Sequence, residues 1–299
     1  MALTFPLPTS VPSKWVGFEA WMERALEQAG RVQPDWDADD IHDLRVAFRR
    51  CRTMADALSQ VNPAPGWRKL KKTSRELFHA LGVLRDTQVE RARVKKMGPT
   101  SDPVRKHMLR VLARAETKHL RAAEQALDRF DRKEWKKLTR KLAPKARFFP
   151  LESVVFQRLA LAALNEAVEL YRQALERRSI IAWHRLRIGI KKFRYLTENF
   201  LPRRYEVWAA DLKRMQDLLG EVHDLDVLRS DLRKHASKLD RAIVAQWVEK
   251  IERERKTHLQ EFLSKTSGPE SPWLDWRAGF QWGHALVAAS LPDAQRRTA

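Results

Sequence analysis

The 299-residue sequence contains a single cysteine, Cys51, and no long apolar run. One cysteine cannot build a disulfide framework or a zinc site of several thiolates, so we expect Cys51 to be a small core residue in a reducing compartment. No stretch holds about 18 apolar residues without a charge, so we expect no membrane-spanning helix. Residues Met1–Ser13 lack the charged segment and apolar run of a secretory signal. These absences favour a cytoplasmic protein.

Signals for β-structure are missing as well. The chain has no alternating Val, Ile and Thr runs and no Asn-Gly or Asp-Gly hairpin turns. Apolar residues recur instead at helical spacing, which predicts an all-α fold. The expected helices are Lys14–Ala29, Ala38–Ser59, Gly66–Lys96, Pro103–Phe130, Lys133–Leu142, Ser153–Glu176, Ile180–Asn199, Arg204–His235, Lys238–Leu263 and Trp273–Ala289. A break at Ala143–Pro150 near the middle predicts two domains, residues 1–147 and 148–299.

Acidic residues are scarce relative to basic ones. The sequence has 58 Lys and Arg against 38 Asp and Glu, which gives a formal net charge of +20. Folding does not require such an excess, because like charges repel each other in the compact state. The imbalance therefore indicates an anionic partner, such as nucleic acid, an anionic membrane surface or another phosphate polymer.

The two halves of the sequence repeat each other. Segment Ile41–Arg52 aligns with Trp183–Tyr195 without a gap, so that basic residues meet basic ones and apolar residues meet apolar ones. Further along, Ala80–Val89 aligns with Leu218–Val227. Two matched blocks in the same order predict an internal duplication.

Each repeated helix carries a basic stripe beside an apolar one. On a helix, Leu44, Phe48 and Cys51 share an apolar face, and the basic stripe lies roughly 120° away. The stripe residues are His42, Arg45, Arg49 and Arg52 in the first copy and His184, Arg187, Lys191 and Arg194 in the second. Arg50 and its counterpart Lys192 lie toward the far edge. A solvated face would usually mix charge signs, whereas these cations repel each other in both copies, which favours a functional role.

The length of the stripe suits several phosphates in a row. Residues 42 to 52 span about 15 Å of helix, and arginine offers a planar fork for phosphate oxygens. The sequence lacks a GxxxxGK[ST] phosphate loop. Five basic residues that precede the second repeated block are weaker candidates, since they could equally form a solvated face: Lys71, Lys72, Arg75, Lys213 and Arg214.

These motifs resemble the conserved histidine α-helical domain, CHAD, over roughly residues 14–265. The family signature is a duplicated His-x-x-Arg-x-x-x-[Arg/Lys]-[Arg/Lys]-x-Arg helix, each copy followed by Leu-Gly-x-x-[Arg/His/Asn]-Asp. The first copy here consists of His42, Arg45, Arg49, Arg50 and Arg52 with Leu81, Gly82, Arg85 and Asp86. The second consists of His184, Arg187, Lys191, Lys192 and Arg194 with Leu219, Gly220, His223 and Asp224. His223, in place of Arg85, predicts a pH-dependent charge.

The resemblance implies two four-helix bundles related by a pseudo-twofold axis. It also implies a basic groove that binds inorganic polyphosphate, and association with polyphosphate granules. The residues alone do not separate polyphosphate from nucleic acid, so a nucleic-acid-binding protein is the alternative, and a metal-dependent phosphohydrolase is a third class. We expect no enzyme activity, no cofactor and no metal, because Arg45 and Arg49 flank His42 and disfavour a bound cation. The oligomeric state is left open.

Several roles have two interpretations at this stage. His42 and His184 either contact phosphate or anchor their helices by hydrogen bonds. Asp86 and Asp224 are expected to hold arginines in place. Gly82 and Gly220 are expected to allow a close approach or a kink. The aromatic C-terminal tail either caps the second bundle or forms a surface for a partner; its aromatic residues are Trp273, Trp276, Phe280 and Trp282.

Overall fold

The computed structural model describes residues 17–32, 36–236 and 239–289, with side chains up to residue 280. This part of the chain forms eleven helices and no strand, which confirms the all-α prediction. The helices are α1 (Phe18–Arg31), α2 (Ala38–Val61), α3 (Pro65–Thr73), α4 (Arg75–Met97), α5 (Pro103–Asp128), α6 (Arg132–Arg147), α7 (Val154–Arg177), α8 (Ile180–Phe200), α9 (Pro202–His235), α10 (Arg241–Thr266) and α11 (Pro272–Ala289). Among the described helices, none is long and apolar enough to cross a membrane.

Three predicted boundaries were wrong. The single helix predicted over Gly66–Lys96 is two helices, α3 and α4, which meet at Ser74. The predicted break at Ala143–Pro150 falls later, because α6 continues to Arg147 with Pro144 inside it. Proline there removes one hydrogen bond near the helix end, but the neighbouring Leu142 and Ala143 are buried and hold the turn in place. The helix predicted from Lys238 begins at Arg241, where the Asp240 side chain accepts two backbone N–H groups. The predicted helix start at Lys14 lies outside the described residues.

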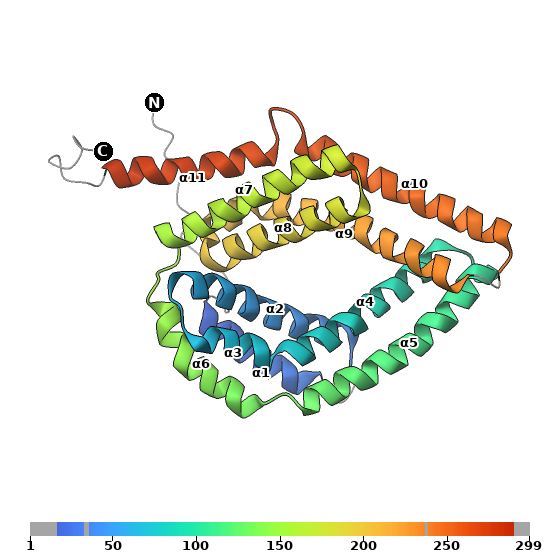
Figure 1. The fold of residues 1–299 in the computed structure, drawn as a ribbon, viewed down its shortest axis with the longest axis horizontal. Helices are drawn as coiled ribbons and strands as arrows, with labels where there is room; N and C mark the ends of the chain where they lie inside the picture. The colour runs from blue at the N-terminus through green and yellow to red at the C-terminus, as the bar shows by residue number, and fades with distance from the viewer. Residues whose placement is uncertain (1–16, 33–35, 237–238, 290–299) are drawn as a thin grey trace.

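The helices form two groups (Figure 1). Helices α1, α2, α3 and α6 pack together in the first half, and α7, α8, α9 and α11 pack together in the second. In each half a long helical hairpin extends from the group, namely α4 with α5 and α9 with α10. Cys51 is fully buried in the first half, as expected for a small core residue.

The two halves join at both ends of the molecule. Near one end α2 contacts α8, and the main core contains buried residues of both halves. At the other end a smaller apolar cluster joins the tips of the hairpins, where Val94 and Met108 of the first half share a core with Leu228 and Trp247 of the second. The chain therefore surrounds a central region that is bordered by both basic helices (Figure 1).

The described part of the aromatic tail belongs to the core of the second half. Trp273, Trp276 and Phe280 are buried. The Trp273 ring stacks on Tyr171 with centroids 5.5 Å apart, and Trp276 lies 5.4 Å from Phe193. Of the two expected roles, the structure therefore shows the capping role for these residues. The side chain of Trp282 lies outside the described residues.

Candidate functional site

The basic stripes of α2 and α8 face each other across the centre of the molecule. The guanidinium of Arg49 on α2 lies 4.9 Å from the ring centroid of Tyr195 on α8. Lys191 on α8 lies close enough to Arg187, Arg49 and Arg45 for their charges to disfavour its protonated form. We call Arg45, Arg49, Arg187 and Lys191 the central cluster. It brings together residues that are about 140 positions apart in the sequence.

The central cluster contains buried cationic groups with few partners. The Nε atoms of Arg45, Arg49 and Arg187 are buried and have no hydrogen-bond partner among the described residues. The one ion pair of the cluster within the described chain is long, 3.9 Å from Arg45 Nη2 to Asp86 Oδ1. Burying charged donors without partners is costly, so this arrangement is suited to an anion that accepts several hydrogen bonds.

The pKa of Lys191 reports the same electrostatic environment. Burial, followed by repulsion from Arg187, Arg49 and Arg45, lowers the pKa of the Lys191 ammonium to about 7. Burial also lowers the pKa of Arg49 and Arg187, although arginine stays charged at neutral pH. A bound anion would raise the pKa of Lys191 again, because an opposite charge favours the charged form. Binding of an anion here is therefore coupled to proton uptake.

Three histidines lie near the cluster, and all are biased toward the neutral form. The rings of His184 and His223 lie 4.6 Å apart, with 3.2 Å between their Nδ1 atoms. Burial, together with Arg187, His184 and Lys191, lowers the pKa of His223 to about 4. Desolvation and nearby cations also lower the pKa of His184 and His42. The expected pH-dependent charge of His223 thus falls below neutral pH in the free protein.

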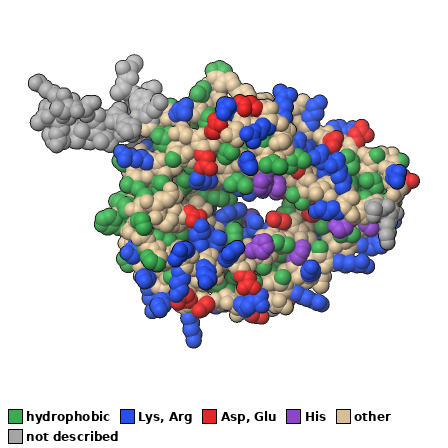
Figure 2. Space-filling view, in the orientation of Figure 1, with side chains coloured by type: hydrophobic (Ala, Val, Ile, Leu, Met, Phe, Trp, Pro, Cys, Tyr) green, Lys and Arg blue, Asp and Glu red, His purple; other side chains and the backbone are tan. Residues whose placement is uncertain are grey.

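Figure 2 shows an opening at the centre of this face of the molecule, between the two halves. Histidine side chains and Lys or Arg side chains gather around its rim, with a few acidic groups among them. Within the described residues, no three His, Cys, Asp or Glu side chains are grouped so that they could hold a metal ion. The surroundings of the opening are therefore dominated by groups that attract anions.

Arg50 lies outside the central cluster and joins the two halves. Its guanidinium forms an ion pair with Glu198 and donates a hydrogen bond of 3.2 Å to Asn199 Oδ1, both on α8. It also lies 4.2 Å from the ring centroid of Trp21. The counterpart residue Lys192 forms an exposed ion pair of 2.6 Å with Glu166 instead. Neither residue points to the centre together with the stripes.

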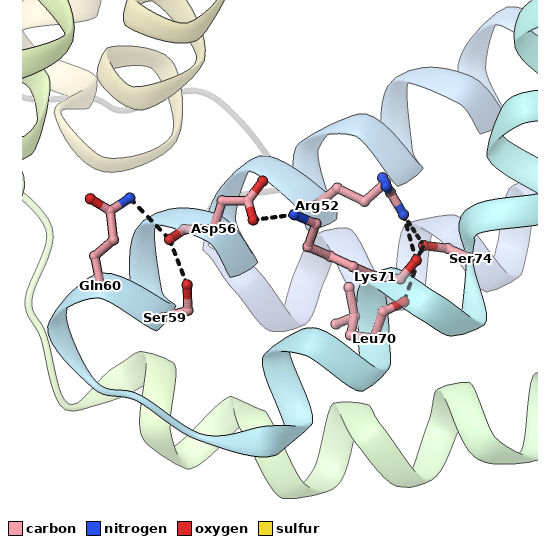
Figure 3. Close-up of polar contacts among 7 residues, drawn as sticks. All are labelled: Arg52, Asp56, Ser59, Gln60, Leu70, Lys71 and Ser74. Carbon is pink, nitrogen blue, oxygen red and sulfur yellow. Dashed lines mark hydrogen bonds and ion pairs between the residues drawn. The ribbon is translucent and has the colours of Figure 1, made fainter.

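The ends of the two stripes are fixed by other helices. Arg52 donates hydrogen bonds to the Lys71 carbonyl at 2.6 Å and to Ser74 Oγ at 3.1 Å, which ties α2 to the junction of α3 and α4 (Figure 3). Arg194 donates to the Tyr205 hydroxyl at 3.2 Å. These bonds leave Arg52 and Arg194 with a structural role in addition to their charge.

The weaker candidates lie on the outside of the molecule. Lys71 forms an ion pair with Asp56 (Figure 3). In the second half Lys213 pairs with Asp217, and Arg214 lies 3.1 Å from Glu261. Lys72 and Arg75 are exposed. The sequence grouped these five residues together, whereas the structure gives three of them an acidic partner.

The two glycines of the repeated motif differ in their surroundings. A Cβ atom at Gly82 would lie 3.4 Å from Arg45 Nε, so this glycine lets the Arg45 guanidinium lie against α4. At Gly220 nothing lies within 4 Å of such an atom. The expected close approach is therefore present in the first half only.

The two aspartates of the motif both lie near arginines, as expected. Asp86 faces Arg45, and Asp224 lies 3.7 Å from Arg93 Nη2. Because Arg93 belongs to the first half, Asp224 helps to join the halves. Arg93 also forms an ion pair of 2.7 Å with Glu221. The sequence offered no signal for this link between α4 and α9.

Sequence reasoning also missed Tyr195. Its ring is buried and contacts the Arg49 guanidinium of the other half. Its hydroxyl has no hydrogen-bond partner within the described residues. A signal was available, because Tyr195 follows Lys191 by four positions and therefore shares its helix face. Its aromatic ring provides a surface on which a guanidinium can be held in place.

The fold has counterparts among known proteins. The CHAD domain family matches residues 18–233. The crystal structure of the CHAD domain from the plant Ricinus communis has a TM-score of 0.58 and 18% identity, over 93% of this chain and 96% of that chain. PptA from Streptomyces chartreusis has a TM-score of 0.58 and 16% identity, over 82% of this chain and 97% of that chain. A comparison with curated proteins found no match. Because the family match spans most of the sequence, the chain belongs to the CHAD domain family.

Proposed function

We propose that the protein binds inorganic polyphosphate at the central cluster, without catalysing a reaction on it. The observation that carries the proposal is the set of buried, unpartnered Nε donors on Arg45, Arg49 and Arg187, contributed by both halves to one place. A phosphate polymer supplies what these donors need, namely closely spaced oxygens that accept charge-assisted hydrogen bonds.

A polymer suits the arrangement better than a single phosphate. The cations are distributed along two helices, and His42 and His184 continue the stripes on α2 and α8. A chain of phosphates would contact many of these groups at once, and linked contacts strengthen one another through effective concentration. The neutral histidines could then act as uncharged hydrogen-bond donors to the phosphate oxygens.

The remaining basic residues have supporting roles in this proposal. Arg50 and Arg194 hold the helices in position, and the outer lysines and arginines raise the local positive potential that attracts the polymer. The outer residues are Lys71, Lys72, Arg75, Lys192, Lys213 and Arg214. A polymer-binding protein of this kind would act in the cytoplasm at polyphosphate granules.

Charge reversal at one central residue tests the proposal. Arg49→Glu should lower the affinity for long-chain polyphosphate by at least about tenfold, because it replaces a buried donor by a repelling charge. Arg185→Glu is the matched control, since Arg185 lies on α8 but is exposed, and it should change the affinity little. Titration calorimetry gives both affinities, and equal losses in the two variants would contradict a central site.

Two further measurements separate the proposal from its alternatives. Duplex DNA or RNA is added as a competitor at equal phosphate concentration, and we expect polyphosphate to remain bound. Displacement by nucleic acid would favour the nucleic-acid-binding alternative. Phosphate release is then measured with polyphosphate and added divalent metal ions. If phosphate is released above the background, and Arg49→Glu abolishes this release, the protein is a hydrolase and a purely binding function is contradicted.

A further inference from the structure

A groove on the first half continues outward from the central cluster. It lies between α2 and α4 and is an open hollow of about 590 Å³. Helix α2 contributes Arg45 and Arg52, and α4 contributes the rest of the lining at helical spacing: Arg75, Glu76, Phe78, His79, Gly82, Val83 and Asp86. Because Arg45 belongs to both the groove and the central cluster, the two adjoin at this residue.

The groove presents positive charge along its length. The guanidinium groups of Arg45 and Arg52 lie 5.8 Å and 5.0 Å from the ring centroid of Phe78, so one aromatic ring helps to position both. These arginines are seven residues apart, or about 10 Å along α2. Arg75 is exposed at the outer end, near enough to Arg52 for the two charges to repel each other.

The acidic residues of the groove have cationic partners of their own. Glu76 forms an ion pair with Arg129, which directly follows α5, and Asp86 faces Arg45. Arg75 forms no ion pair with an acidic residue in the described part of the chain. An anion in the groove would therefore meet positive charge at Arg75 that no ion pair offsets, and at Arg52, whose charge the nearby Asp56 offsets only in part.

The second half lacks this arrangement at the positions that align with it. Lys213 aligns with Arg75 but pairs with Asp217, which itself stands where the first half has His79. Glu221 stands in place of Val83, and Gln216 in place of the aromatic Phe78. At one position the order is reversed, because Arg214 stands in place of Glu76.

We propose that the α2/α4 groove is a second phosphate-binding subsite, so that a polyphosphate chain leaves the central cluster along the first half only. This rests on the proposed function of the central cluster. Arg52 and Arg75 hold the outgoing phosphates, and Gly82 leaves room for the Arg45 guanidinium between the groove and the central cluster. The bound chain consequently lies asymmetrically on a protein whose sequence is duplicated.

The proposal is tested with two matched variants and two ligands. Arg75→Glu reverses the charge at the outer end of the groove, and Lys213→Glu reverses it at the aligned, equally exposed position of the second half. Each is titrated with tripolyphosphate, which is short enough for the central cluster alone, and with long-chain polyphosphate. Thermal melting followed by circular dichroism verifies that both variants fold.

We expect Arg75→Glu to weaken binding of the long chain by about tenfold and to reduce the slope of log affinity against log salt by about one. Its affinity for tripolyphosphate should stay within about twofold of the parent protein. Lys213→Glu should weaken binding of either ligand by about twofold at most, because Lys213 adds only to the general positive potential around the site. Three results would overturn the one-sided subsite. The two variants could weaken long-chain binding equally, Arg75→Glu could have no effect, or Arg75→Glu could weaken binding of both ligands equally. Arg49→Glu is measured alongside: if it leaves tripolyphosphate binding intact, the central site itself is wrong, and the test of the groove is separate from that failure.

Discussion

Lys191 shows how a cluster of buried cations alters the side chains that form it. Burial, together with three arginines from two helices, lowers its pKa to about 7, so a residue that is ordinarily charged becomes half neutral near physiological pH. Burial and the nearby cations also lower the pKa of His223, which favours its neutral form. The charge of the site at neutral pH is thus carried mainly by arginines, and Lys191 adjusts it.

Affinity for polyphosphate should therefore decrease as pH rises. The anion binds the protonated form of Lys191, which predominates below the free-state pKa of about 7 and is lost above it. Between about pH 6 and about pH 8 we expect a loss of up to about tenfold. Long chains are used, because their internal phosphates do not titrate in this range. Lys191→Arg stays charged and should flatten the profile; an unchanged profile in this variant would show that another group is responsible.

Gly82 offers a second test at the level of single residues. Gly82→Leu places a side chain where the Arg45 guanidinium lies, so Arg45 should be displaced and polyphosphate affinity should fall. Gly220→Leu is the matched control, since the space around that position is open, and it should bind as the parent protein does. Affinities come from titration calorimetry. Equal effects of the two substitutions would contradict the specific role of Gly82.

At the scale of helices, α2 and α8 are held together by contacts that differ from those that would bind a ligand. Arg50 joins the two helices through Glu198 and Asn199, on a side of α2 away from the stripe. Arg93 joins α4 to α9 in the same manner. The central cations can therefore remain close to one another, because other ion pairs offset their mutual repulsion.

Loss of the Arg50 link should destabilise the fold without abolishing the site. Arg50→Ala leaves the poorly exposed Glu198 without this partner, and we expect a loss of about 2 to 3 kcal/mol in the free energy of unfolding. The aligned Lys192→Ala removes an exposed pair and should cost less than about 1 kcal/mol. Urea denaturation measures both. If Lys192→Ala were as destabilising as Arg50→Ala, the assignment of Arg50 as the structural link would fail.

The helices themselves could be predicted from the sequence, but their contacts could not. Helical spacing and the Pro and Gly breaks located α5, α7 and α8 to within two residues. The division at Ser74 could not be predicted, since no Pro or Gly marks it and the hydrogen bond from Arg52 that Ser74 accepts there comes from another helix. The partners of aligned residues could not be predicted either, because Arg50 and Lys192 form ion pairs with different neighbours although their sequence contexts match.

At the scale of the whole molecule, two helical groups and two hairpins surround one central region (Figure 1). The sequence predicted two equivalent basic stripes, and the internal duplication stays a prediction from the aligned motifs. The repeats predicted a shared site only on the assumption that equivalent faces meet. In the structure the basic faces of α2 and α8 do lie together, because Arg49 lies over the Tyr195 ring and three arginines lie around Lys191.

The central claim is that both helices form a single site. It is tested most directly by titration calorimetry of polyphosphate of one defined length against the paired variants Arg45→Glu with Arg49→Glu on α2, and Arg187→Glu with Lys191→Glu on α8. Circular dichroism confirms that helicity and melting are retained. If the site is shared, either pair alone removes most of the affinity. If each pair instead halves the number of bound chains and leaves the affinity of the remainder unchanged, the helices bind independently and the account is wrong.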